Sequence, residues 1–386
     1  MIPESQRAKE VKDLSSNYRS KALGVKWNVT KDLLYFDVSV SPDVVVTRRH
    51  MLSFVASIFD PLGLVSPVVV TGKLLFQEAT RLKIPWDSEV PADLKNKWES
   101  WLVVLRMVVK FEIPRCVKPV GFEDAFLELH HFSDASQRAY GCCTYLRCVD
   151  RSGHISVSLV LSKCKVAPLK QITIPRLELQ GAVLAAKVDD MLKSELDLHL
   201  GPSYFWTDSE IVLKYIQNED RKFHVFVANR VSVIRQSTSV DQWHHISGKD
   251  NPADRVSRGQ DVQGLNLKEW LFGPSFLGKF KSEWKVDDVC SSLSEDDPEV
   301  KSELKKKPEL CFLSDVEYDP LEKLMEHYSS WYKLKRAVAW MLRLGIILEV
   351  KRSKWKLPWS VWPMDKIGVP RIRWTDQKCQ DQNKGH

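Results

Sequence analysis

The order of strand-like and helix-like segments between Phe126 and Arg258 constrains the fold more than any other feature of this sequence. Short apolar or alternating runs indicate strands, and longer stretches with apolar residues three and four positions apart indicate helices. The predicted order is three strands, a helix, a strand, two helices, a strand and a final helix. This order is typical of an α/β layer fold.

Two segments carry this prediction most clearly. In "HISVSLVLSK", residues 154–163, apolar side chains alternate with serines, so we expect a strand with one buried and one solvated face. In "IPRLELQGAVLAAKVDDMLKSEL", residues 174–196, Pro175 suits a helix start and an apolar stripe follows. Gly181 and the neighbouring alanines leave room for a sheet to approach this helix.

The residues before this region predict a different, mainly helical module. Residues 20–46 contain a strand pair, "KALGVKWNV" and "DLLYFDVSV", and helices are expected after Thr47, over 66–82 and over 92–109. After the α/β region come a charged linker, a basic helix and an irregular tail. We therefore divide the chain into 1–46, 47–119, 120–262, 263–320, 321–350 and 351–386.

Composition narrows the class of protein without fixing its function. The chain has 57 basic and 50 acidic residues, a net charge of +7, which fits a polyanionic partner without requiring one. No apolar leader and no run of about 18 apolar residues occurs, so we expect an intracellular protein, cytoplasmic or nuclear, with no membrane segment. The eight cysteines show no zinc-ligand spacing and are expected to be reduced thiols.

Four acidic residues fall where this fold would bring them together. Asp134 and Asp208 come at the ends of two predicted strands, Glu178 lies in the first turn of the long helix, and Asp254 lies in the closing helix. Alone, each has an ordinary explanation as a turn residue or a helix-dipole partner. Together they would repel one another unless cations neutralised them. Because oxygen ligands suit hard ions, we expect Mg²⁺ or Mn²⁺, two ions about 4 Å apart, as in phosphodiester hydrolysis.

The closing helix is predicted from "NPADRVSRG", residues 251–259. Asn251 can cap it, Pro252 can begin it and Gly259 can end it.

Eight segments in this order resemble the polymerase polyprotein of BEL/Pao-type LTR retrotransposons, from the end of the reverse transcriptase through its ribonuclease H domain. They are "ALGVKWNV", "LSFVASIFDPLGLVSPVVV", "PWDSEVP", "FSDASQRAYG", "IPRLELQGA", "FWTDSEIVL", "WHHISGKDNPADRVSRG" and "SSWYKLKRAVAWMLR". The resemblance implies a ribonuclease H-like mixed sheet flanked by helices, preceded by a primer-grip-like strand region and a thumb- or connection-like helical module. The last segment resembles the stretch that leads into the integrase.

The resemblance also implies the site and its substrate. Asp134, Glu178, Asp208 and Asp254 stand where ribonucleases H keep their metal-binding carboxylates, and the substrate would be an RNA/DNA hybrid. Other parts of the polyprotein are possible partners. Five basic residues are candidates for nucleic-acid contacts. They are Arg48, Arg49, Lys73, Lys249 and Arg258.

Two departures and two alternatives accompany this hypothesis. Many ribonucleases H carry a histidine before the final aspartate, whereas "ISGKDNPAD" offers Lys249, so proton transfer or product release would be slower unless Lys249, His244 or His245 substitutes. No YxDD-type motif occurs, so DNA synthesis is not expected. An aspartic peptidase would need Asp-Thr-Gly or Asp-Ser-Gly, and neither is present. The alternative is a non-catalytic nucleic-acid-binding relic.

Overall fold

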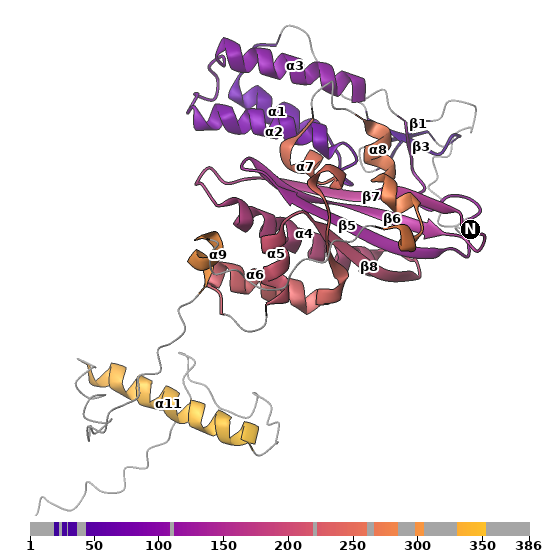
Figure 1. Cartoon of the computed structure of the whole chain (residues 1–386). Coiled ribbons are helices and arrows are strands. Elements are labelled where there is room, and N and C mark those ends of the chain that lie inside the picture. Colours follow the sequence, from indigo (N-terminus) through magenta and orange to yellow (C-terminus); the bar gives the residue numbers. More distant parts are fainter. Residues whose placement is uncertain are drawn as a thin grey trace, which may run out of the picture. The chain divides into compact units, whose positions relative to one another are not determined.

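The structure is a computed structural model that describes residues 19–22, 25–28, 30–36, 44–108, 112–218, 222–260, 266–284, 298–304 and 330–352. The chain divides into two compact units, residues 1–306 and residues 307–386. Everything that positions the candidate site lies in the first unit (Figure 1).

A five-stranded mixed sheet forms the centre of the first unit. Its strands are β5 (Phe126–Ala135), β6 (Ala139–Val149), β7 (Ile155–Val166), β8 (Leu200–Thr207) and β9 (Trp243–His245). They lie side by side in the order β7-β6-β5-β8-β9. The first three pair antiparallel, and β5–β8 and β8–β9 pair parallel. This topology confirms the predicted ribonuclease H-like α/β fold.

Helices cover both faces of the sheet, as Figure 1 shows. On one face lie α4 (Ile174–Glu195), α5 (Glu210–Gln217) and α6 (Val225–Ser237). Their apolar side chains form a buried cluster with strand residues such as Leu129, Leu146 and Phe205. On the other face lie the helices of the preceding module together with α7 (Asp254–Arg258) and α8 (Leu267–Phe272). Both faces of the sheet are therefore covered by helices and packed with apolar side chains.

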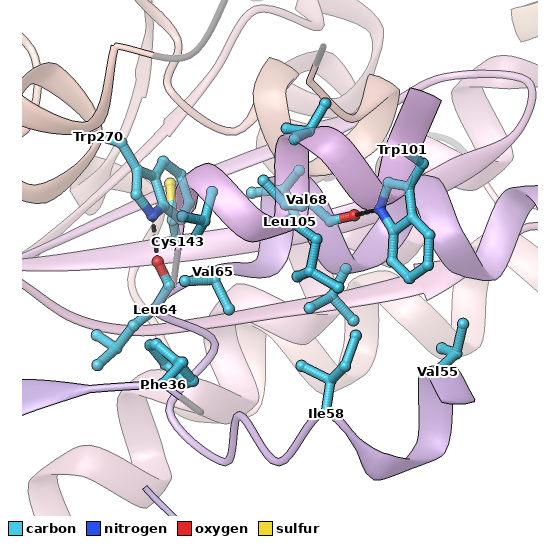
Figure 2. Packing of buried hydrophobic residues seen from close by; sticks show 14 of the residues in the cluster. Phe36, Val55, Ile58, Leu64, Val65, Val68, Trp101, Leu105, Cys143 and Trp270 are labelled. Atoms are coloured by element: carbon cyan, nitrogen blue, oxygen red, sulfur yellow. Dashed lines mark hydrogen bonds between the residues drawn. The ribbon is translucent and has the colours of Figure 1, made fainter. Parts of the chain in front are cut away.

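The helical module comprises α1 (Arg48–Ser57), α2 (Ser66–Arg81) and α3 (Ala92–Val108), which agree with the predicted helices. It shares one apolar cluster with the sheet, because Trp98 and Trp101 belong to the same cluster as Phe132 and Trp206. In Figure 2 the indole of Trp101 donates to the backbone oxygen of Val68 at 2.8 Å. The hydrophobic core is therefore continuous across the domain boundary that we expected between residues 119 and 120.

The N-terminal strands form a second, four-stranded sheet in place of the predicted pair. Its antiparallel strands are β1 (Arg19–Ala22), β2 (Val25–Asn28), β3 (Leu33–Tyr35) and β4 (Ile113–Pro114). The segment "KALGVKWNV" contributes two strands, since Ala22 pairs with Val25 across a reversal of the chain. The fourth strand, β4, follows α1, α2 and α3 in the chain. No local sequence pattern indicated that it would join this sheet. Residues 37–40 of the predicted second strand lie outside the described residues.

The prediction of a solvated face on β7 is wrong. Val157 and Leu159 pack in the cluster beneath the helical module, whereas Val160 and Leu161 pack in the cluster beneath α4. The alternation changes face because the register with β6 shifts between Thr144 and Tyr145, which leaves Val160 as the extra residue of a bulge. Ser162 is also buried, and its amide donates to the Leu62 backbone oxygen at 2.8 Å.

The expected charged linker over 263–320 is wrong for the residues of it that the structure describes. Residues 266–284 form α8 and two short 3-10 helices, and their Trp270, Leu271 and Leu277 are buried in the core. Helix α9 (Pro298–Glu303) packs by Val300, which is 2% exposed. These apolar residues are spaced among charges, so the mean composition concealed them.

The second unit contains α11 (Trp331–Arg352), which agrees with the predicted basic helix. The irregular tail predicted over 351–386 is wrong for residues 351 and 352, because α11 extends to Arg352, and residues 353–386 lie outside the described residues. Among the helices of the described ranges, none is both long and apolar enough to cross a membrane.

Candidate active site

Asp134 and Asp208 lie beside each other at the carboxyl edge of the sheet. Strands β5 and β8 run parallel, and Ser133 pairs with Thr207, so the residues that follow these two are neighbours. Asp134 is the ninth residue of a buried strand and is only 4% exposed. Two acids thus meet at one edge because parallel strands end together, as the sequence predicted.

Helix α4 brings Glu178 to the same edge. It packs closely across the sheet at Gly181, where an added Cβ would lie 3.1 Å from the backbone oxygen of Asp134. Glu178 lies one turn earlier, and its Oε2 accepts a hydrogen bond from the Ser209 hydroxyl at 2.5 Å. Ser209 directly follows Asp208 and caps α5 by accepting from the Val212 amide. The capping residue thereby joins Glu178 to the end of β8.

Two side chains of the last segment attach α7 to this edge. The Asn251 amide donates to the backbone oxygen of Ser133 at 3.1 Å and to Oδ1 of Asp208 at 3.2 Å. The Ser257 hydroxyl donates to Oδ2 of Asp134 and to the backbone oxygen of Asp254 at 3.1 Å. Asp254 therefore lies at the same edge as the other acids.

The start of this helix differs from the prediction. Helix α7 begins at Asp254 and not at Pro252, and Asn251 bonds the amide of Ala253 in the turn before the helix. The Asn251 side chain thus accepts from a backbone amide just before the helix while its Nδ2 donates to Ser133 and Asp208. Gly259 ends the helix with φ of +81°, as predicted.

Three of the acids interact electrostatically at this edge. Burial, together with the negative charges of Asp208 and Asp254, raises the pKa of Asp134 to about 7, although the Ser257 hydrogen bond acts to lower it. Burial also raises the pKa of Asp208, reinforced by Asp254 and opposed by hydrogen bonds from its own backbone and from Asn251. Like charges in a buried edge favour a bound cation or a proton.

The residues before the final aspartate occupy distinct places. His245 ends β9 opposite Thr207, and its charge acts on Asp208. His244 faces the other side of the sheet, where it packs against Tyr204 and Trp206. Lys249 is exposed, in a short turn that begins at Gly248. A Cβ added at Gly248 would lie 3.1 Å from Oδ2 of Asp208, so this turn passes close to that acid. Of the three proposed substitutes for the missing histidine, His245 thus interacts electrostatically with Asp208.

The other basic candidates are only partly brought to this edge. Arg258 bonds Asp254 directly, one turn earlier on the same helix. Arg49 instead forms a two-bond ion pair with Asp87, at 2.7 and 3.1 Å. Arg48 donates to the Ile84 backbone oxygen at 2.8 Å and lies over the Trp86 ring. These two arginines stabilise the start of α1 and do not contact the acids.

Lys73 lies in a cavity of about 390 Å³ between α2 and β7, which Asp60 and Ser162 also line. No contact joins it to the acidic edge in the described part of the chain.

Sequence reasoning missed the three side chains that connect the edge, Ser209, Asn251 and Ser257. Asn251 was noted only as a helix cap. Ser257 follows Asp254 by three positions, a spacing that puts both on one helical face, but serine is too common for that spacing to be a signal.

The donors fit a hard cation in their chemistry, since all are carboxylate oxygens. Across the described ranges, however, no three His, Cys, Asp or Glu side chains are gathered as a ready metal site. Three of the acids have hydrogen-bonded partners instead: Ser257 bonds Asp134, Ser209 bonds Glu178 and Arg258 bonds Asp254.

Solved ribonuclease H structures resemble the chain weakly. They include RNase H1 of Halobacterium salinarum NRC-1 (13% identity, 34% of this chain and 93% of that chain, TM-score 0.24). The N-terminal RNase H domain of rv2228c from Mycobacterium tuberculosis gives 12% identity, 34% and 91% coverage and a TM-score of 0.24. LC11-RNase H1 in complex with an RNA/DNA hybrid gives 14% identity, coverage of 36% of this chain and 99% of that chain, and a TM-score of 0.21. A search of the curated proteins gives no match.

The family model described as a Pao retrotransposon-like RNaseH-like domain matches residues 47–209. The match begins at α1, in agreement with the shared core, and it includes Asp134, Glu178 and Asp208 but ends before Asp254. Residues 47–209 of this chain are therefore similar to the Pao retrotransposon-like RNaseH-like domain.

Proposed function

We propose that the first unit hydrolyses the RNA strand of an RNA/DNA hybrid with the help of divalent cations. The observation that supports this most is the meeting of Asp134, Asp208 and Asp254 at one edge of the sheet. Burial and the charges of Asp208 and Asp254 raise the pKa of Asp134, and burial and the charge of Asp254 raise that of Asp208. Such an arrangement is unfavourable by itself. Its cost is offset when a cation binds.

In this proposal Asp134, Glu178, Asp208 and Asp254 hold Mg²⁺ or Mn²⁺. The ions, when bound, would activate a water and stabilise the leaving oxygen of the phosphodiester. The protein's own polar side chains would orient the carboxylates for these ions. They are Ser209, Asn251 and Ser257, which act through the hydrogen bonds described above. Contacts to 2′-hydroxyl groups in the shallow minor groove would select the RNA strand.

Cleavage of a labelled RNA/DNA hybrid by the purified full chain tests the proposal. We expect cleavage that needs Mg²⁺ or Mn²⁺ and that falls by about 100-fold or more in Asp134→Asn and in Asp208→Asn, as is usual for loss of a metal-assisted step. Asp190→Asn is the matched control, since Asp190 is exposed on α4 and distant from the edge. Equal cleavage by Asp134→Asn and by the control would contradict the proposal.

A second candidate is a nucleic-acid-binding protein without catalysis. It is favoured by the absence of a gathered metal-binding group in the described residues and by the partners that hold the acids. Tight hybrid binding with no cleavage at any Mg²⁺ or Mn²⁺ concentration would support it.

A further inference from the structure

A group of basic and aromatic side chains lies next to the acidic edge, on the α4 and α6 side of the sheet. We call Arg176, Arg230, Phe226 and Tyr140 the cationic patch. Both guanidinium groups lie over the same ring, at 4.8 Å for Arg176 and 3.4 Å for Arg230 from the centroid of Phe226. Burial, and the nearby positive charge of Arg176, lower the pKa of Arg230, which Tyr140 opposes.

The patch is continuous with the candidate active site along the chain and across the sheet. Arg176 precedes Glu178 by two residues in the first turn of α4. Tyr140 pairs with Ala135, the residue that follows Asp134. A polyanion held at the acidic edge would therefore extend over these guanidinium groups.

One acidic side chain already occupies part of the patch. Arg176 donates from Nε to Oε1 of Glu303, the last residue of α9. Helix α9 is fixed there by the buried Val300 and by the His224 amide, which donates to the Glu303 backbone oxygen at 2.8 Å. The Glu303 side chain is only 6% exposed.

The occupant satisfies the patch incompletely. Oε2 of Glu303 is buried and has no hydrogen-bond partner in the described part of the chain. Arg230 donates only to the Phe226 backbone oxygen, at 3.0 Å, and has no carboxylate partner among the described residues. A buried charge with one oxygen unbonded is costly, and a second guanidinium without a counter-charge adds binding capacity for an anion.

We infer that the cationic patch binds a backbone phosphate of the hybrid and that Glu303 holds the place of this phosphate in the free protein. A phosphate has more acceptor oxygens than a carboxylate and matches guanidinium geometry, so it can bond both arginines where Glu303 bonds one. This inference rests on the proposed function for the identity of the anion. It adds that the chain carries its own competitor for the substrate.

Hybrid binding by Glu303→Gln tests the inference. The measurement is the Kd of a fluorescently labelled hybrid, from anisotropy, with Asp134→Asn as the common background so that no cleavage occurs. Removing the competing charge should tighten Kd by about 5-fold, the size of a modest ion-pair term. Arg176→Ala should weaken Kd by a similar factor and lower the slope of log Kd against log salt by about one. Combined with Arg176→Ala, Glu303→Gln should have no further effect.

The matched control is Glu195→Gln, the same change in charge at the exposed far end of α4. It should leave Kd within error, and thermal melting of each variant shows whether it is folded. An unchanged Kd in folded Glu303→Gln, or equal tightening in the control, overturns the inference. These outcomes are separate from the proposed function, whose failure would show as absence of cleavage by the wild-type chain.

Discussion

The hydroxyl of Ser257 in α7 donates a hydrogen bond to Oδ2 of Asp134 in β5, across 123 positions of sequence. The same hydroxyl donates to the backbone oxygen of Asp254, so a single serine joins the first and last acids of the candidate site. Its hydrogen bond is the main local interaction that lowers the pKa of Asp134 against burial and neighbouring charge.

Replacing Ser257 with alanine should therefore raise the pKa of Asp134 further. If Asp134 acts as a carboxylate, the rise in cleavage rate with pH should move to higher pH in Ser257→Ala, and Ser257→Thr should retain most of the wild-type profile. The loss of a buried hydrogen bond should also cost about 1–2 kcal/mol of stability. The measurement is the pH profile of hybrid cleavage at saturating Mg²⁺. A profile that keeps its midpoint while stability falls would show that Ser257 has only a structural role.

The close approach of α4 to the sheet at Gly181 leads to a second prediction, which concerns the position of this helix. An added Cβ would lie 3.1 Å from the Asp134 oxygen and 3.3 Å from the Gly141 oxygen, both backbone atoms of the sheet. Gly181→Ala should therefore push α4 outward, lower the free energy of unfolding by about 1–3 kcal/mol and move Glu178 away from the edge. Chemical denaturation and hybrid cleavage measure the two effects.

Gly278→Ala is the control for this substitution, because no atom lies within 4 Å of a Cβ built there. Wild-type stability and cleavage in Gly181→Ala would mean that the helix does not need this close approach.

Strand β5 contains two buried histidines, and the first of them, His130, leads us to expect a loss of stability in acid. Burial lowers the pKa of His130 from 6.5 to about 4. Its Nδ1 accepts from the Trp206 indole at 3.2 Å, so protonation there would break a hydrogen bond. Between these pH values the unfolded chain takes up a proton and the folded chain does not, so acidification favours unfolding.

From pH 6.5 to 4 the wild-type chain should lose up to roughly 3 kcal/mol through His130, with His131 acting in the same direction. In His130→Gln the dependence over this window should be shallower, whereas the exposed His154→Gln should follow the wild type. Urea unfolding at several pH values measures it. Equal slopes in all three proteins would contradict the assignment to His130.

The sequence predicted the order of strands and helices along the chain and the meeting of the acids because both depend on local patterns. Asp134 and Asp208 each follow a recognisable strand, and parallel strands must end at the same edge. The Pro175 helix start likewise placed Glu178. These features need no knowledge of what packs on them.

What the sequence did not predict depends on contacts between distant segments. Val160 becomes a bulge residue only because β6 shifts register against β7, and Trp270 appeared to lie in a linker until its partners across the chain were known. The ion pair between Arg176 and Glu303 likewise joins residues that are far apart in the sequence. Local composition carries no information about such pairs.

The contact between Trp270 and Leu64 allows a test of whether the helical module and the sheet unfold as one. The Trp270 indole donates to the Leu64 backbone oxygen at 2.8 Å, and both residues are buried in the shared cluster (Figure 2). Trp270→Phe should leave that oxygen without its donor and lower the free energy of unfolding by about 1–3 kcal/mol. A single urea transition shifted to lower midpoint is expected.

Trp101→Phe removes the corresponding bond to Val68 inside the helical module and should shift the same single transition. Trp331→Phe, at an exposed position of α11, should leave it in place. If the two modules were independent, Trp101→Phe would shift one of two transitions and Trp270→Phe would separate them further. Because one apolar cluster contains both Trp101 and Phe132, we expect one transition, and a ribonuclease H-like fragment that begins at residue 120 should be less stable than the intact first unit.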